Sequence, residues 1–382
     1  SQDVHDHIVH FYHLHALDWV DVVSAAQADP AAAVEFAKAI GSTWRGNNVD
    51  LFTKVRDTVQ AVLDSGQLSI FTGGYWNHPD YRLPPEANLM AVAHYLDALE
   101  FQRSMIRIQT VFGGKNPHPN FLVGGMASSI DPDSNETVNQ VQLDKIRTWV
   151  AESKEFVETC YWPDVKAIMG VYKDYYSIGA GQPNYLAVGL GGVTFSGNPS
   201  DDRNAIVIGG VQPGVIFGDN FSAVQPFDAT KITEYVTSAW YKYADGDVGL
   251  HPDRGETVVD YTGPQPPYEW LGDNDKYTWC KAPRYDDKVV QVGPMPRVML
   301  AYAQGHEGTK KLVDEVLAAH GITVEQLNST AGRTISRGIE AYTSALHLEE
   351  VFNEFVANIK NGDIDVFDST KWEPKTWPQQ AT

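Results

Sequence analysis

The sequence predicts a predominantly helical α+β protein, in which a helix-bundle body carries a smaller glycine-rich region that contains strands. Apolar residues recur at helical spacing along most of the first 173 residues and again toward the end of the chain. Between residues 174 and 228 glycine becomes frequent, and short β-prone runs replace the helical pattern. We therefore expect a helical core part over residues 1–173, a β-containing insertion over residues 174–228, and a helical part over residues 229–382 that completes the same domain.

Start and stop signals position the individual elements within these parts. Asp29-Pro30 marks a turn before a helix, and Pro84-Pro85-Glu86 places proline and an acid in a first helical turn. The expected helices cover an opening segment to about residue 26 and then residues 30–39, 50–64, 85–110, 139–172, 231–243, 296–303, 309–320 and 335–361. The expected strands cover residues 185–188, 205–208 and 214–217, as a small sheet or hairpin layer on the helical body.

Bulk composition limits the classes of partner. Hydrophobic residues make up 43% of the chain, which is enough for a sizeable core. A formal net charge of −20 argues against nucleic acid or an anionic membrane as partner, because both favour a basic surface. We expect no direct membrane span, because the sequence has no apolar run of 18 residues, and its two cysteines supply no disulfide framework.

The opening segment has the densest chemistry, because five of the 12 histidines fall between residues 5 and 15. On a regular helix, Asp6, His10 and His13 share one face, at spacings of four and three residues. This arrangement brings a carboxylate within reach of two imidazoles, which can hold or relay protons near neutral pH. The neighbouring face carries the apolar residues expected in the core, namely Val4, Ile8, Phe11, Trp19 and Val22, together with His15.

The histidine-rich face leaves three roles open. Histidines on a partly buried helix often only pack or bind neighbouring polar groups. Metal ligation is a second role, although the His-Glu-x-x-His order of helical zinc hydrolases is absent. Proton handling is the third. Elsewhere, we expect His94 to be a packed or hydrogen-bonded core residue, and residues 113–125 to form a tightly packed glycine- and proline-rich loop.

Lys281 and Arg284 form the other charged pair of interest. A solvated salt bridge is the simplest role for each. Their neighbours Trp279, Pro283 and Tyr285 also allow partial burial, where a lysine must be paired or lose its charge.

Several longer motifs occur in one order along the chain. They run from His5 to Trp19, Gly74 to Pro79, Leu83 to Leu89, Ala93 to Leu96, Phe112 to Asn120, Trp279 to Tyr285, Gly332 to Thr334 and Trp372 to Pro374. Together these motifs resemble the large, catalytic subunit of nickel–iron hydrogenases, and the resemblance spans essentially all 382 residues.

The resemblance implies the reversible reaction H2 ⇌ 2H+ + 2e−. It places Asp6 as the catalytic residue, in the polar canopy over the open coordination position of the metal centre. It makes His10, His13, Lys281 and Arg284 candidates for a supporting polar or proton-conducting network. It further implies an iron–sulfur small subunit as partner, because this chain has no cysteine clusters for such centres. The exported uptake branch of the family is the nearest in character, so we expect a periplasmic location with membrane association through partners.

The cofactor implied by the resemblance is a nickel–iron centre with diatomic ligands. Relatives bind it through two Cys-x-x-Cys pairs, which this sequence lacks, and Cys160 and Cys280 match no metal-ligand spacing. We therefore expect the chain to be the central portion of such a subunit, with no metal ligands of its own and no activity alone.

Two other functions remain open. One is a non-catalytic scaffold or assembly subunit that keeps the hydrogenase fold without binding the metals. The other is a hydrolase whose metal site would be built on Asp6, His10 and His13.

Overall fold

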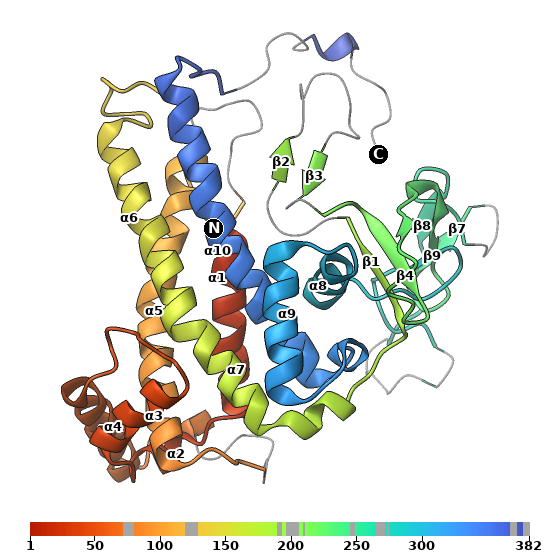
Figure 1. Ribbon diagram of the computed structural model, residues 1–382. Helices are drawn as coiled ribbons and strands as arrows, with labels where there is room; N and C mark the ends of the chain where they lie inside the picture. Colours follow the sequence, from red (N-terminus) through yellow and green to blue (C-terminus); the bar gives the residue numbers. More distant parts are fainter. Residues whose placement is uncertain are drawn as a thin grey trace.

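The computed structural model consists of a body of long helices with short strand pairs along one side (Figure 1). It describes residues 1–71, 80–118, 129–188, 193–195, 206–208, 211–244, 249–264, 272, 275–366 and 373–376. The motif at residues 74–79, parts of the motifs at residues 112–120 and 372–374, and much of the loop expected at residues 113–125 lie outside the described residues.

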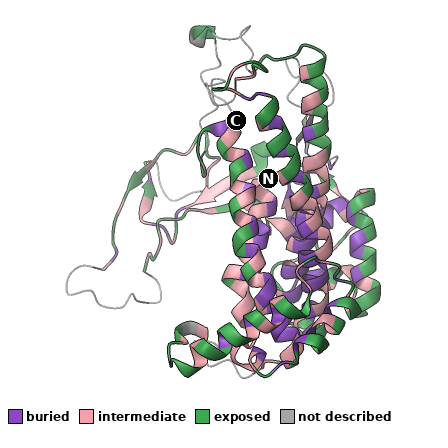
Figure 2. Ribbon diagram, turned by 90° about the vertical axis from the view of Figure 1, so that its left-hand side faces the viewer, coloured by how far each residue is buried: buried purple, intermediate pink, exposed green. Residues whose placement is uncertain are grey.

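Three long helices form the frame of the body. They are α5 (Pro85–Gly113), α6 (Gln140–Phe156) and α10 (Thr330–Lys360). The short first helix α1 (Gln2–Val9) contacts both α5 and α10, so the histidine-rich segment begins inside the body (Figure 1). The buried residues gather on the facing sides of these helices, whereas the outer faces are exposed (Figure 2).

The remaining helices cover this frame. They are α2 (Val22–Ala25), α3 (Pro30–Ala39), α4 (Val49–Asp64), α7 (Trp162–Val171), α8 (Pro294–Ala303) and α9 (Glu307–His320), with short 3-10 segments at Ala16–Asp18, Ser69–Phe71, Lys173–Ser177, Ala229–Lys231, Val324–Leu327 and Pro374–Thr376. In the described part of the chain, no helix combines the length and hydrophobicity needed to cross a membrane.

Helix ends follow the local sequence. The α5 helix begins with proline at its first positions and stops at Gly114, whose φ of 74° is readily adopted only by glycine. The α10 helix begins after Ser329, whose hydroxyl accepts a hydrogen bond from the backbone N–H of Gly332. The structure confirms seven of the expected helices, with ends moved by a few residues. They are the helices expected over residues 30–39, 50–64, 85–110, 139–172, 296–303, 309–320 and 335–361.

The opening segment departs from the regular helix expected up to residue 26. After Val9 the chain widens into a π-helix, η1 (His10–His15), and the helical path ends at Asp18. A second π-helical turn, η5 (Val157–Tyr161), joins α6 to α7 and packs against η1 through aromatic rings. His10 still follows Asp6 with a regular helical hydrogen bond, whereas the wider winding of the π-turn shifts the positions after His10, so the spacing calculated for His13 no longer applies.

The strands form four small antiparallel sheets. They are β1 (Asn184–Ala187), β2 (Val193–Phe195), β3 (Ile206–Ile208), β4 (Gly214–Phe217), β5 (Gln225–Pro226), β6 (Ile232–Tyr235), β7 (Tyr241–Tyr243), β8 (Thr257–Val259) and β9 (Ala282–Tyr285). The order β1-β4-β5 makes the one three-stranded sheet of the described residues, and the pairs β2-β3, β6-β9 and β7-β8 make the others. In the first sheet Tyr185 is opposite Ile216, and both side chains are buried where the sheet meets α8.

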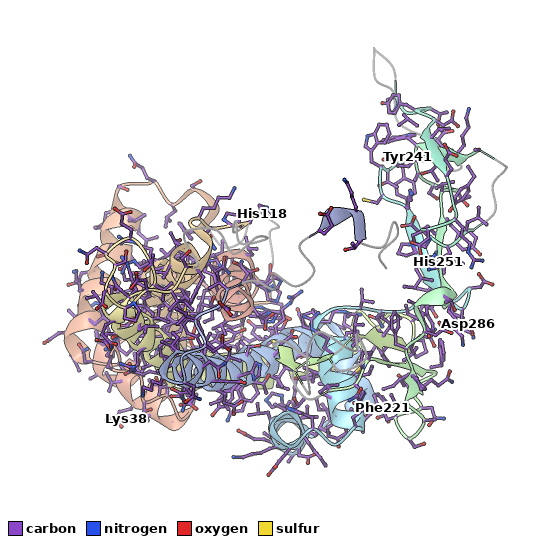
Figure 3. All side chains as sticks on the ribbon, turned by 90° about the horizontal axis from the view of Figure 1, so that it is seen from above. Lys38, His118, Phe221, Tyr241, His251 and Asp286 are labelled. Atoms are coloured by element: carbon purple, nitrogen blue, oxygen red, sulfur yellow. The ribbon has the colours of Figure 1, made fainter. Side chains whose placement is uncertain are left out.

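The helix expected over residues 231–243 is wrong. This stretch forms β6 and β7, and Ile232 pairs with Tyr285 on β9. Its alternation of β-branched, aromatic and charged residues suits a half-exposed strand, and pairing with a distant strand outweighs the weak helical spacing. Strands therefore continue to residue 285, past the boundary at residue 228, in an arm beside the helical body (Figure 3). The three-part division of the chain otherwise stays a prediction.

Candidate hydrogenase site

Asp6 is held at the surface of the helical body by its neighbours on α1. Its side chain is 58% exposed, and its Oδ1 accepts a hydrogen bond of 2.5 Å from Nε2 of Gln2. The same oxygen lies 2.8 Å from Nδ1 of His5. On the other side of the imidazole, Nε2 of His5 is 3.3 Å from Oε1 of Gln102 on α5. Asp6 is therefore oriented from α1 and, through His5, from α5.

Asn116, in the segment after α5, contacts the Gln2 side chain that binds Asp6. Asn116 donates hydrogen bonds to Oε1 of Gln2 at 3.3 Å and to Oε1 of Gln109 at 2.5 Å. Gln109 also donates to Gln2. Residues of the Phe112–Asn120 motif thus support the side chain that binds Asp6.

His7, on the opposite side of α1, belongs to a buried ionic cluster. Its Nε2 lies 3.0 Å from Oε2 of Glu340 and 3.4 Å from Oδ1 of Asp3. Glu340 is fully buried on α10 and binds Arg297 of α8 through both oxygens. Burial lowers the pKa of His7, but the hydrogen bonds and charges of Asp3 and Glu340 outweigh burial, so this pKa is raised above its ordinary value. The cluster ties α1 to α8 and α10.

His10 and His13 do not join Asp6. Nδ1 of His10 and Nε2 of His13 are buried and have no hydrogen-bond partner among the described residues. Burial, followed by the charge of Arg337, lowers the pKa of His10 to about 4, and burial also lowers the pKa of His13. Both imidazoles are therefore neutral near pH 7. His13 instead packs edge-on against Tyr95 and lines a mainly apolar cavity of about 190 Å³ between η1, α4 and α5.

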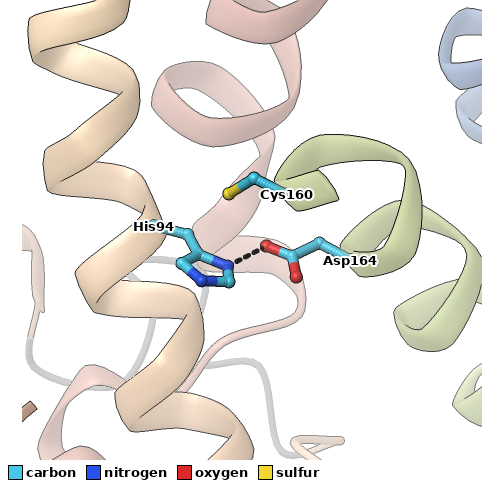
Figure 4. Close-up of side chains that lie close together, drawn as sticks. All are labelled: His94, Cys160 and Asp164. Atoms are coloured by element: carbon cyan, nitrogen blue, oxygen red, sulfur yellow. Dashed lines mark hydrogen bonds and ion pairs between the residues drawn. The ribbon is translucent and has the colours of Figure 1, made fainter. Parts of the chain in front are cut away.

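A second buried polar cluster lies where the two π-turns meet. Nδ1 of His94 is 2.7 Å from Oδ2 of Asp164, and Tyr12 donates a 2.7 Å hydrogen bond to the same oxygen (Figure 4). Nε2 of His94 is 2.7 Å from Oδ1 of Asn47, and Cys160 lies 3.7 Å from the Tyr12 hydroxyl. Burial raises the pKa of the Cys160 thiol well above its ordinary value. The prediction that His94 is a hydrogen-bonded core residue is confirmed.

Comparison with known proteins decides the family. The family described as "Nickel-dependent hydrogenase" matches residues 1–382. The chain belongs to the nickel-dependent hydrogenase family. It is 42% identical over 391 residues to the uptake hydrogenase large subunit of Rhizobium leguminosarum bv. viciae, covering 99% of this chain and 64% of that protein. It is 37% identical over 387 residues to the hydrogenase-1 large chain of Escherichia coli K12, again covering 99% of this chain and 64% of the relative.

Solved hydrogenases share the fold. The Ni-Fe-Se hydrogenase from Desulfovibrio vulgaris Hildenborough in the as-isolated oxidized state has a TM-score of 0.61 at 23% identity, covering 92% of this chain and 59% of that one. The reduced, active Ni-Fe-Se hydrogenase from Desulfomicrobium baculatum has a TM-score of 0.56 at 22% identity, covering 92% and 60%. The expected family and the predominantly helical α+β fold are both confirmed.

The hydrogenase centre implied by the family was tested against the donor atoms in this chain. Two groups of metal-ligand donors converge among the described residues: Asp3 with His7 and Glu340, and His94 with Cys160 and Asp164. Neither group contains two cysteines, and Cys280 is exposed just before β9. In both groups, members are already hydrogen-bonded to one another. These residues do not fit a centre that is held by paired thiolates.

Lys281 and Arg284 lie in the strand arm of this hydrogenase-family chain. Nζ of Lys281 is 3.1 Å from Oε2 of Glu234 on β6, and the two side chains are 28% and 27% exposed. Arg284 donates a hydrogen bond to the backbone oxygen of Pro283. The described partners of both residues belong to the arm, and neither is hydrogen-bonded or paired to Asp6.

Sequence reasoning missed the side chains that hold Asp6 in place. His5 and Gln2 contact Asp6 directly, whereas Gln102 contacts His5 and Asn116 contacts Gln2. One signal was available, because Asn116 belongs to a recognised motif and His5 directly precedes Asp6. Gln2 lies four residues before Asp6 on the same helix, a spacing that allows contact, whereas Gln102 gives no local signal because only tertiary packing brings α5 beside α1.

Proposed function

We propose that this chain is the central part of the large subunit of a nickel–iron hydrogenase, which catalyses reversible oxidation of H2 to protons and electrons. The match of the family along all 382 residues, with 42% identity to an uptake hydrogenase large subunit, carries this proposal. The chain spans about 64% of the length of the curated relatives named above. The proposed metal centre is therefore ligated by cysteines in parts of such a protein that these residues do not include.

Asp6 is the residue of this chain that we assign to the reaction. Its carboxylate is exposed, and one oxygen is fixed by Gln2 and His5. A carboxylate held in this way can accept a proton released from H2 and pass it on without a large side-chain movement. The two hydrogen bonds orient the group before the reaction, which removes the need to order it during turnover.

One partner and one location complete the proposal. An iron–sulfur small subunit receives the electrons, because the described residues contain no cluster of cysteines that could hold redox centres in series. We also propose a periplasmic location with membrane association through partners, and the similarity to uptake hydrogenase large subunits is the support for this proposal. Detection of the protein and a co-purifying iron–sulfur chain in the periplasmic fraction supports both statements. Recovery only from the cytosol, without such a chain, contradicts them.

The Asp6→Asn variant tests the catalytic assignment. The protein is purified with its co-purifying chains, and H2-dependent reduction of a redox dye is measured across pH. We expect a fall in kcat of about 10²–10⁴-fold, the range for losing a positioned acid or base, with nickel and iron content unchanged. Asp57→Asn on the exposed face of α4 is the matched control and should retain activity. Unchanged H2 oxidation by the Asp6 variant at every pH would contradict the assignment.

A non-catalytic scaffold or assembly subunit is the second candidate. The observation that favours it is that the described donor groups do not fit a paired-thiolate centre. A scaffold of this kind would purify without nickel and would not oxidise H2 in any complex. By contrast, the structure gives no support to the metal hydrolase, because Asp6, His10 and His13 are not among the donor groups that converge in the described residues.

A further inference from the structure

We propose that His5 is the positioning residue of Asp6 and shares a single proton with it, in a dyad in which Gln102 keeps a hydrogen on Nε2 of His5. The proposal rests on the role given to Asp6 above and extends it to a residue that the family match does not identify. It concerns three side chains of two neighbouring helices, α1 and α5.

The two side chains of the dyad, His5 and Asp6, differ in burial. The His5 side chain is 15% exposed, whereas that of Asp6 is 58% exposed. His5 is wedged between α1 and α5, with one nitrogen on Gln102 and the other on Asp6. A partly buried imidazole that is bonded at both nitrogens has little freedom to rotate. It can therefore fix the position of the exposed carboxylate.

Accounting for hydrogen atoms defines the tautomer. Oε1 of Gln102 can only accept, so Nε2 of His5 must carry a hydrogen. The 2.8 Å contact between Nδ1 and Oδ1 of Asp6 then needs one further proton, because neither atom can donate without it. That proton lies on Nδ1, giving imidazolium and carboxylate, or on Oδ1, giving imidazole and carboxylic acid. It can cross between the two atoms while both heavy-atom positions stay the same.

Gln2 adds a bias between these two arrangements. Its amide donates to the same oxygen, Oδ1, at 2.5 Å. Two donors on one oxygen favour the carboxylate, with the shared proton on His5. Among the described residues, no hydrogen bond is found to Oδ2 of Asp6, which leaves that oxygen available to a reacting group. Asp6 can then accept a proton at Oδ2 while His5 keeps its own.

Two other titratable groups lie near the dyad. His13 of η1 interacts with His5, and burial lowers the pKa of His13, so His13 carries little charge near neutral pH. Asp3 lies three residues before Asp6 on α1, but it pairs with His7 on the buried side. The side chains that face the dyad from α5, Gln102 and Gln109, are uncharged. A proton on Nδ1 of His5 would therefore place a positive charge directly beside Asp6.

Substitution of His5 by glutamine tests the proposal in the protein purified with its co-purifying chains. The kcat of H2-dependent dye reduction should fall about 10- to 100-fold with little change in KM, the scale expected when a reacting group is misplaced. The acidic limb of the pH–rate profile should move to higher pH, because Asp6 loses its neighbouring cation. His251→Gln is the matched control, since His251 also faces an aspartate, 3.6 Å away, but lies on the strand arm (Figure 3).

Gln102 variants separate positioning from stability. Gln102→Leu removes the acceptor and should lower kcat in the same direction as His5→Gln, whereas Gln102→Glu keeps an acceptor and should retain activity. If Gln102 had a purely structural role, the activity of both variants would rise and fall with their melting temperatures. Identical pH–rate profiles for wild type, His5→Gln and His251→Gln would overturn the proposal.

An infrared titration keeps this test independent of turnover. The carboxyl stretch that disappears in Asp6→Asn reports the protonation of Asp6, and its midpoint should move to higher pH in His5→Gln. If the wild type does not oxidise H2, the proposed function fails, yet this titration still decides the dyad. An unmoved midpoint in active protein would refute the dyad alone.

Discussion

Glu340 gives the most demanding test of how α1 is held in place. This carboxylate has no exposed surface, and it binds Arg297 through both oxygens and His7 at 3.0 Å. Glu340→Gln keeps the shape of the side chain but leaves the half-buried Arg297 without its carboxylate partner and leaves His7 with Asp3 alone. Breaking a buried ion pair from one side costs about 3–5 kcal/mol, so we expect a loss of that size in the free energy of unfolding.

The control is a carboxylate on the same helix with an exposed partner. Glu349 pairs with Lys154 at 2.7 Å, and these side chains are 40% and 32% exposed. Glu349→Gln should cost below about 1 kcal/mol, as expected for a pair at the surface. Both variants are unfolded in guanidinium chloride and followed by tryptophan fluorescence at pH 6. A Glu340→Gln loss within about 1 kcal/mol of the control would refute the buried cluster.

The His7–Glu340 pair should also depend on pH in a defined direction. The folded state raises the pKa of His7 above its unfolded value of about 6.5, because Asp3 and Glu340 outweigh burial. Stabilisation from a raised histidine pKa is fully present below pH 6.5 and is lost as pH rises through the folded pKa. A double-mutant cycle of His7→Gln and Glu340→Gln should therefore show a larger coupling energy at pH 6 than at pH 9. Equal coupling at both pH values would contradict this reasoning.

Three further predictions concern stability away from the ionic cluster. Because the pKa of His10 is lowered to about 4 in the folded state, between pH 6.5 and 4 the proton binds His10 in the unfolded chain but not in the folded protein, which destabilises the fold. The free energy of unfolding should therefore fall less between pH 7 and pH 4.5 in His10→Gln than in wild type. With partial solvent screening, the difference should be about 1–2 kcal/mol, measured by urea titration at the two pH values. Tyr12→Phe removes a donor from buried Asp164 and should cost about 1–3 kcal/mol in the same assay, with unchanged stability as the contrary result. A Cβ at Gly332 would collide with the backbone of Leu327, so Gly332→Ala should lower the melting temperature, whereas Gly308→Ala in α9, with no neighbour nearer than 3.7 Å, should raise or preserve it. Equal effects of the two alanines would contradict the close approach at Gly332.

Elements with strong local signals could be predicted from the sequence. The α5 helix carries proline and an acid at its start and glycine at its end, and the structure has it at residues 85–113. Most of the core face expected for the opening segment is confirmed, since Val4, Ile8, Phe11 and Trp19 are buried, whereas His15 and Val22 are only half-buried. In both cases the information lies within a few turns of one helix.

Features that depend on distant partners could not be predicted. The π-turn η1 and the strand β6 are stabilised by packing against η5 and β9, which lie far away in the sequence. Helical spacing alone also did not choose among the neighbours of Asp6, because four-residue spacing fits both His10 and Gln2, and the structure joins Asp6 to Gln2 and to the adjacent His5. Glu340 and Arg297 gave no local signal, because their chemistry arises only when α8 and α10 meet α1.

The metal content of the protein tests the central claim most directly. The chain is purified from its native source with any chain that accompanies it, and nickel, iron and intact mass are measured by mass spectrometry. The proposed function requires nickel and iron together, iron in excess from the accompanying iron–sulfur chain, and a large-subunit mass well above the 42.3 kDa of these 382 residues. A complex with a mass of 42.3 kDa for this chain and no nickel would contradict the account and would leave a scaffold that keeps the hydrogenase fold without its chemistry.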